Sequence, residues 1–177
     1  MDQAVVRPPM TVDAPMLRAR RAEFVALLRD AVDDDASVGF VQPLAESSLC
    51  AFWDDVAAGI DQGARTVLAV EQDGRIVGSV QLAPCLKDNG RHRGEVQKLL
   101  VFSGARRRGI ARALMDAVEA HARAQGIRLL LLDTREASAA ESLYRRSGWT
   151  AFGTVPDYAC DPDRTLAGCV FFYKRLE

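Results

Sequence analysis

The stretch of sequence that decides the fold is Arg106-Arg107-Arg108-Gly109-Ile110-Ala111. An apolar run of strand character ends just before it, at Phe102. Apolar residues at helical spacing follow it, at Ala111, Leu114, Met115, Val118 and Ala122. The stretch is therefore predicted to lead from a strand into the N-terminus of a helix. Free backbone N–H groups and the helix dipole favour an anion at such a point.

The composition of this stretch predicts a phosphate site. Gly109 lets a phosphate approach the backbone, and the small side chain of Ala111 does not block it. The three arginines offer forked donors that suit phosphate oxygens. Cations at a helix N-terminus oppose the dipole, so a bound anion is favoured over a merely solvated surface. A nucleic-acid patch is a weaker alternative, because no aromatic residues are interleaved with the arginines.

The whole chain has the composition of one ordinary globular domain, covering residues 1–177. About half of the residues are hydrophobic and the formal net charge is −1, which argues against nucleic acid or an anionic membrane as partner. The four cysteines are far apart and form no metal-binding cluster with histidine, so no metal is expected. No secretory signal or membrane span is recognisable, and a cytoplasmic protein with reduced thiols is predicted.

Outward from this stretch, the hydrophobic periodicity predicts an α/β fold. The expected strands cover residues 5–7 (Val5-Val6-Arg7, a short edge strand), 66–71, 75–82, 95–102, 128–133, 149–155 and 169–175. Helices are expected from Thr11 or Asp13 to Val32, and over residues 44–62, 111–126 and 136–147. A polar loop is expected at residues 156–168, between the last two strands.

Two segments of the chain resemble the GCN5-related N-acetyltransferase family. Arg106-x-x-Gly109-x-Ala111 is similar to its Gln/Arg-x-x-Gly-x-Gly/Ala motif, and a second block matches its Ala-x-x-Leu-Tyr-x-x-x-Gly-Phe segment: Ala140-Glu141-Ser142-Leu143-Tyr144-Arg145-Arg146-Ser147-Gly148-Trp149. The resemblance implies a mixed, mostly antiparallel central sheet of about six to seven strands. Helices would cover both faces, and the two central parallel strands would splay apart. It also implies acetyl-CoA as co-substrate and acetylation of an amine.

Other segments resemble the tabtoxin-resistance members of that family, over nearly the whole chain. They are residues 36–40, 95–99, 132–134 and 158–166. This likeness implies a small amino-acid-like primary amine as acceptor, with a β-lactam toxin among the candidates. Two alternatives stay open: acetylation of a protein or peptide, which the acidic run Asp33-Asp34-Asp35 could attract, and a non-catalytic acyl-CoA-binding regulatory module. The protein would be a monomer or a homodimer.

The resemblance also assigns the residues that hold the cofactor. The strand segment Leu99-Leu100-Val101 would pair its backbone with the pantetheine arm, and Arg106 to Ala111, followed by Arg112, would bind the pyrophosphate. The family's usual Asn, seven residues before its Tyr, is replaced here by Ala137. Ser138 is a candidate substitute for that contact.

Three residues are candidates for the chemistry. Tyr144 matches the family's general acid, which protonates the sulfur of coenzyme A; the alternative is an aromatic residue of the core. Glu95 lies eleven residues before Arg106, the separation of the catalytic Glu in the family's histone-modifying branch; the alternative is a solvated strand end. Asp133 would lie near Glu95 as a second base or an anchor for an ammonium group, or else cap the next helix.

Two loops and two histidines complete the expectations. The loops at residues 37–40 and 158–166 are expected to form walls of the acceptor pocket. His92 and His121 are expected to lie in solvent and to take no part in the chemistry.

Overall fold

The computed structural model describes residues 7–177 and contains a seven-stranded sheet of order β1-β2-β3-β4-β5-β7-β6. The strands are β1 (Met10–Val12), β2 (Thr66–Gln72), β3 (Arg75–Pro84), β4 (Arg93–Val101), β5 (Leu129–Arg135), β6 (Thr150–Cys160) and β7 (Leu166–Arg175). Only the central neighbours β4 and β5 are parallel among the described residues; all the other pairs are antiparallel. The expected mixed, mostly antiparallel α/β sheet is confirmed.

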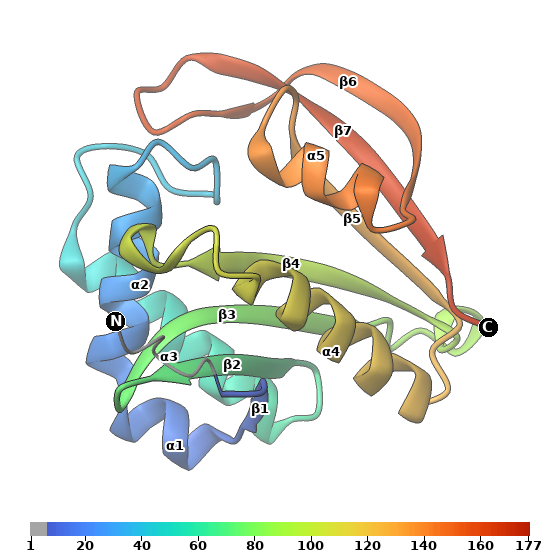
Figure 1. Cartoon of the computed structure of the whole chain (residues 1–177), viewed down its shortest axis with the longest axis horizontal. Coiled ribbons are helices and arrows are strands. Elements are labelled where there is room, and N and C mark those ends of the chain that lie inside the picture. Colours follow the sequence, from blue (N-terminus) through green and yellow to red (C-terminus); the bar gives the residue numbers. More distant parts are fainter. Residues whose placement is uncertain (1–6) are drawn as a thin grey trace.

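Helices cover both faces of this sheet, as expected. They are α1 (Ala14–Ala19), α2 (Arg21–Asp33), α3 (Glu46–Asp61), α4 (Ile110–Ala124) and α5 (Ala139–Arg146). Two single-turn helices, η1 (Asp88–Gly90) and η2 (Ser103–Ala105), flank β4. Figure 1 shows α4 lying across β3 and β4, and α5 beside β5.

The two faces have separate cores because strand side chains alternate. In β2, Leu68 and Val70 join the core under α4 and α5, and Val67 and Ala69 join the core under α1, α2 and α3. Each core therefore fixes one layer of helices to the sheet.

The centre of the sheet opens into a splay. β4 and β5 pair only where residues 93–95 meet residues 129–131, although β4 continues to Val101 and β5 to Arg135. Figure 1 shows the two strands meeting near the C-terminus and separating toward their other ends. The backbone edges that face each other beyond this point are left without a strand partner.

Two expectations about element boundaries were wrong. The single helix expected up to Val32 is divided at Arg20 into α1 and α2. Of its two expected starting residues, Thr11 lies in β1 and Asp13 is the N-cap of α1, since Asp13 Oδ1 accepts a hydrogen bond of 2.8 Å from Met16 N. The polar loop expected at 156–168 is mostly strand, because β6 and β7 extend through it and leave a short turn at 161–165. The residues of that hairpin are largely polar and exposed, so the periodicity of apolar residues does not predict it. The edge strand expected at residues 5–7 lies, apart from Arg7, outside the described residues.

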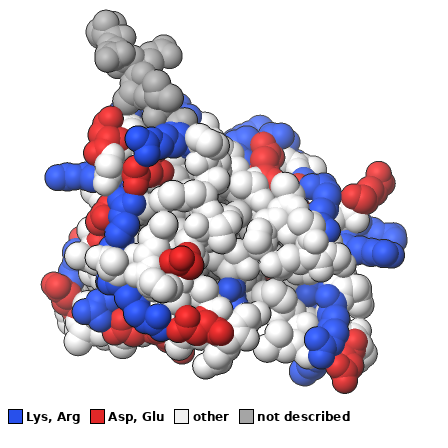
Figure 2. Space-filling model, turned by 90° about the horizontal axis from the view of Figure 1, so that it is seen from below, with Lys and Arg blue, Asp and Glu red and all other residues white. Residues whose placement is uncertain are grey.

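Charged side chains of both signs are interspersed on the surface. On the face drawn in Figure 2, basic and acidic residues lie side by side around a centre that is mostly uncharged. That mixture fits the formal net charge of −1. No helix within residues 7–177 is long and apolar enough to cross a membrane.

The contact between β3 and α4 allows a test of the packing that positions the central loop. A Cβ added at Gly78 would lie 2.9 Å from Ile110 Cγ2 and 3.2 Å from the carbonyl oxygen of Leu100. We therefore expect Gly78→Ala to lower the free energy of unfolding by about 1–3 kcal/mol in urea denaturation, because the backbone cannot yield cheaply. Gly153→Ala is the matched control: no atom lies within 4 Å of its added Cβ. Equal stability of the two variants would contradict this packing.

Candidate functional site

The first part of the site is the open edge of β4. Its other edge pairs with β3, where Leu100 lies opposite Ser79 and Val101 opposite Gly78. On the side of β5, no strand of the described chain pairs with β4 beyond Glu95. Unpaired backbone N–H and C=O groups require hydrogen-bonding partners. An extended ligand that carries amide groups would therefore pair with residues 97–101, which include the predicted Leu99-Leu100-Val101.

A bulge in β4 shapes this edge. The register with β3 shifts between Gln97 and Leu100, and Lys98 has a positive φ of 49°. A bulge adds one residue to a strand and reverses the side-chain alternation beyond it. Leu99 and Val101 consequently pack toward α4. Leu100, between them, packs into the core on the opposite face of the sheet.

The second part of the site is the loop from β4 to α4. Gly109 is the N-cap of α4 with φ of 81°, and Arg107 has φ of 62°. Within the described chain, the first backbone N–H of this helix to find a backbone acceptor is that of Ala113, so those of residues 107–112 are free. Ile110 is fully buried, which anchors the helix start in the core. The predicted concentration of free N–H groups at a helix N-terminus is therefore present.

The three arginines of this loop differ in their surroundings. Arg106 forms an ion pair with Asp34 and donates from Nε to the Val101 carbonyl, 3.3 Å away. Arg108 Nη2 donates to the Gly104 carbonyl at 3.3 Å. Arg106 thus ties the loop to the end of α2, and the contribution of the three arginines to phosphate binding stays a prediction. Arg112, in the first turn, pairs with Asp116.

The acidic residues at the end of α2 support the same loop. Asp30 accepts hydrogen bonds of 2.7 Å from both the backbone N and the Oγ of Ser103, which begins η2. Asp33 accepts a bond from the side chain of Gln42, and Asp34 holds Arg106. Two carboxylates of the acidic run, Asp33 and Asp34, thus have partners within the protein, although all three remain exposed.

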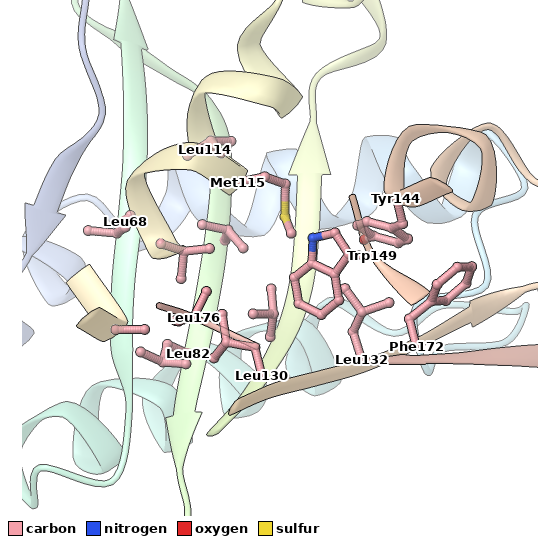
Figure 3. Packing of buried hydrophobic residues seen from close by; sticks show 14 of the residues in the cluster. Leu68, Leu82, Leu114, Met115, Leu130, Leu132, Tyr144, Trp149, Phe172 and Leu176 are labelled. Atoms are coloured by element: carbon pink, nitrogen blue, oxygen red, sulfur yellow. The ribbon is translucent and has the colours of Figure 1, made fainter. Parts of the chain in front are cut away.

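Tyr144 lies on α5 with its ring in the core. The ring packs against Trp149 and Phe172, with centroids 6.0 and 5.9 Å away, and Figure 3 shows the three together. Desolvation raises the pKa of the Tyr144 hydroxyl, and the negative charge of Asp133 raises it further. No side chain or backbone group within residues 7–177 hydrogen-bonds to this hydroxyl. It therefore stays protonated at neutral pH and is free to donate.

The structure brings Glu95 and Asp133 together, as the sequence suggested. Glu95 lies opposite Leu131 in the parallel pair, and Asp133 is two residues further along β5, on the same face. Desolvation raises the pKa of Asp133, the charge of Glu95 raises it further, and Lys98 opposes both. A carboxylate whose pKa is raised in this way, with a second carboxylate beside it, is suited to accept a proton from an ammonium group.

A polar chain behind Glu95 was not recognised in the sequence. Gln97 Nε2 donates to Glu95 Oε1 at 2.9 Å, and Arg65 Nη1 donates to both Gln97 and Gln81 at 3.1 Å. Gln81 is fully buried among the mostly apolar residues of β3. Its polar side chain within that run is the signal that could have revealed the chain, which holds Glu95 in place from behind.

The two loops expected beside the acceptor are in contact. Ser37 Oγ donates to the Cys160 carbonyl at 3.3 Å, and Gln42 N donates to the Pro162 carbonyl at 2.8 Å. Arg164 Nε returns a bond to the Gln42 carbonyl at 3.1 Å. The segment after α2 and the β6–β7 turn are thereby joined to each other.

The remaining residues considered in the sequence are Ser138, His92 and His121. Ser138 is the N-cap of α5, and its Oγ accepts the N–H of Glu141 at 3.1 Å. The hydroxyl can still donate a hydrogen bond, so Ser138 as a substitute for the family's Asn stays a prediction. His92 is exposed in its loop, and His121 is half-buried and bonded to Gln125.

Comparison with known proteins identifies the family. Residues 25–149, well over half of the chain, match the model of the acetyltransferase (GNAT) family. The chain belongs to this family. An uncharacterized N-acetyltransferase encoded in the hisH-hisA intergenic region of Azospirillum brasilense is 36% identical over 109 residues, covering 60% of this chain and 63% of that protein. The chain spans about three fifths of the length of the curated relatives it matches.

Solved structures share the fold at low identity. A ribosomal-protein-alanine N-acetyltransferase from Brucella melitensis has a TM-score of 0.75 at 22% identity, covering 97% of this chain and 99% of that one. A GNAT superfamily phosphinothricin acetyltransferase from Sinorhizobium meliloti, in complex with AcCoA, has a TM-score of 0.74 at 16% identity, covering 99% and 89%. The expected GNAT fold is confirmed. One fold thus serves two kinds of acceptor, so the acceptor here must be argued from this chain's own residues.

The raised pKa of Asp133 predicts a gain in stability when its charge is removed. Its folded-state pKa lies above the unfolded value of about 3.9, so the fold loses stability as the pH rises through that interval. We expect Asp133→Asn to be more stable than the wild type at pH 7 to 8, with a difference that shrinks as the pH falls toward 4. Urea midpoints across this range measure the effect.

Asp163→Asn is the matched control with the opposite sign. Hydrogen bonds from the hydroxyl and the backbone N of Thr165 lower the pKa of Asp163. Its charge therefore stabilises the fold above the unfolded pKa, and that contribution is lost as the pH falls. The control variant should be less stable than the wild type at pH 7. A destabilised Asp133→Asn protein at pH 7 would contradict the environment described for Asp133.

Proposed function

We propose that the chain is an acetyl-CoA-dependent N-acetyltransferase that acts on a small amino-acid-like primary amine. The observation that carries this proposal is that two sets of backbone groups without hydrogen-bonding partners adjoin each other. The open edge of β4 runs directly into the free N–H groups of residues 107–112. An extended amide arm that ends in a pyrophosphate has the groups that both surfaces lack.

This chain's residues fit acetyl-CoA at that place. Residues 97–101 would pair with the pantetheine arm, and the backbone N–H groups from Arg107 to Arg112 would hold the pyrophosphate. Gly109 keeps the approach clear, since no atom lies within 4 Å of a Cβ placed there. When bound, acetyl-CoA supplies an activated acetyl thioester. A backbone N–H of the Leu99-Leu100-Val101 segment would stabilise negative charge on the reacting carbonyl oxygen.

The carboxylates and the phenol move the two protons that the reaction requires. Glu95 or Asp133 accepts a proton from the acceptor's ammonium group, directly or through water, so that the neutral amine can form the new bond to the acetyl carbon. The bond from that carbon to sulfur breaks, and Tyr144 donates its hydroxyl proton to the departing sulfur. The charge of Asp133 reaches Tyr144, so both groups lie close to the splay.

A small acceptor suits the surroundings better than a protein. The joined loops at Ser37–Cys160 and Gln42–Pro162 lie beside the splay, where Gly39 approaches Lys98, and Asp33 and Asp34 of the acidic run already have partners within the protein. The sequence likeness to tabtoxin-resistance enzymes, which keeps a β-lactam toxin among the candidates, points the same way. Acetylation of a polypeptide N-terminus or a lysine is the second candidate. The Brucella melitensis structure, with its named protein acceptor, supports it through the fold alone.

Loss of the Tyr144 hydroxyl tests catalysis against binding alone. We expect Tyr144→Phe to lower kcat by about 10²- to 10⁴-fold while the Kd for acetyl-CoA changes little, because the ring keeps its packing. Thiol release during acetylation of an amine panel gives kcat, and calorimetry gives Kd. Tyr173→Phe, which removes a hydroxyl from β7, is the matched control and should leave kcat unchanged.

The carboxylates need a parallel test. Glu95→Gln and Asp133→Asn are each expected to lower the rate, and the base is the residue whose loss also flattens the acid limb of the pH profile. Unchanged turnover in Tyr144→Phe, Glu95→Gln and Asp133→Asn alike would overturn the catalytic assignment. A non-catalytic acyl-CoA-binding module would then be the better description.

A further inference from the structure

Lys98 projects into the acceptor side of the splay because of the bulge in β4. In regular alternation Val96 points toward α4, Gln97 points away, and Lys98 would return to the core under α4. The extra residue instead leaves Gln97 and Lys98 on one side, and Leu99 fills the core position. The positive φ of Lys98 marks the point of reversal. An amino group is thereby kept out of an apolar core and directed to the face that carries Glu95.

The ammonium group of Lys98 is half-buried and has no hydrogen-bonding or ion-pair partner among the described residues. Its Nζ is 5.8 Å from the centroid of the Phe52 ring and would lie 3.3 Å from a Cβ placed at Gly39. The side chain is half-buried, and desolvation lowers its pKa. Within residues 7–177 it makes no hydrogen bond, and no carboxylate lies within 4.0 Å of it. A shielded cation without a counter-ion is costly, and the aromatic face offsets that cost only in part.

The charged groups around Lys98 leave it without a counter-ion in the opening between β4 and β5. The charge of Asp133 acts on it from β5, across the splay, and that of Glu95 from β4 itself, and neither forms an ion pair with it. Arg65, the other cation nearby, is already held by Gln81 and Gln97. Lys98 is therefore the available positive group at this gap, with Glu95 on the same strand and Asp133 on the facing strand β5.

We propose that Lys98 binds the carboxylate of a zwitterionic acceptor, so that the substrate class is a free amino acid or a close analogue. This inference rests on the proposed function. The acceptor's ammonium group faces Glu95 and Asp133, and its carboxylate supplies the counter-ion that Lys98 lacks. Lys98 is thus a specificity-determining residue. A site built around a shielded charge rejects analogues that cannot pair with it, so amides, simple amines and the N-termini of peptides are poor acceptors.

The test compares acceptors with and without the carboxylate in matched variants. The probes are the standard L-amino acids, their carboxamides and the corresponding decarboxylated amines, assayed by thiol release. For the best amino acid, Lys98→Met should lower kcat/KM by roughly ten- to a hundredfold, the effect of losing one charge-assisted hydrogen bond. The carboxamide should be equally poor in wild type and Lys98→Met. Lys98→Arg should restore part of the activity, and Lys87→Met, which removes an exposed lysine elsewhere, should change nothing.

A binding measurement without turnover separates this role from a structural one. Calorimetric titration of the same amino acid into protein saturated with coenzyme A should show binding to the wild type and much weaker binding to Lys98→Met. Both proteins should bind coenzyme A equally well, which also shows that the variant is folded. Equal loss of activity toward the amino acid and its carboxamide would overturn the role of Lys98. So would efficient acetylation of peptide N-termini or simple amines by the wild type. Failure of the wild type to bind acetyl-CoA would instead contradict the proposed function.

Discussion

The early end of pairing between β4 and β5 is the constraint on which the rest of the structure depends. A parallel pair normally continues as far as both strands run, since each lost hydrogen bond leaves polar backbone groups to be satisfied elsewhere. Here pairing stops at Glu95 and Leu131, and both strands continue apart. The protein thereby keeps an open strand edge at its centre, where helices on both faces shield it. Such an edge is suited to bind an extended ligand.

The splay also explains why groups from both faces of the sheet meet at one point. Tyr144 belongs to the core under α4 and α5, whereas Glu95 and Asp133 lie on the opposite face. A continuous sheet would separate them completely. Because the strands part, the charge of Asp133 acts on Tyr144, and a proton acceptor and a proton donor can serve one reacting centre. The two protons of an acetyl transfer are handled on opposite sides of the sheet.

Much of this arrangement could be predicted from the sequence because local rules are obeyed there. The loop from Arg106 to Ala111 follows the chemistry of a helix N-terminus, and the closeness of Glu95 and Asp133 follows from parallel strand geometry. The features that the sequence did not predict are those that depart from the regular alternation of apolar and polar residues in strands. The bulge at Lys98 reverses alternation, so a reading in steps of two puts that side chain into the core. The β6–β7 hairpin is polar and exposed, and its pairing depends on backbone hydrogen bonds that composition does not reveal.

The measurement that tests the central claim most directly is amide hydrogen exchange with and without acetyl-CoA, read residue by residue. We expect new protection at residues 97–101, on the edge of β4 that faces the splay, and at residues 107–112 at the start of α4. Little change is predicted in β1 and β2, which lie away from the splay in the strand order. Binding of acetyl-CoA that leaves both segments unprotected, or protects a different strand edge, would contradict the account.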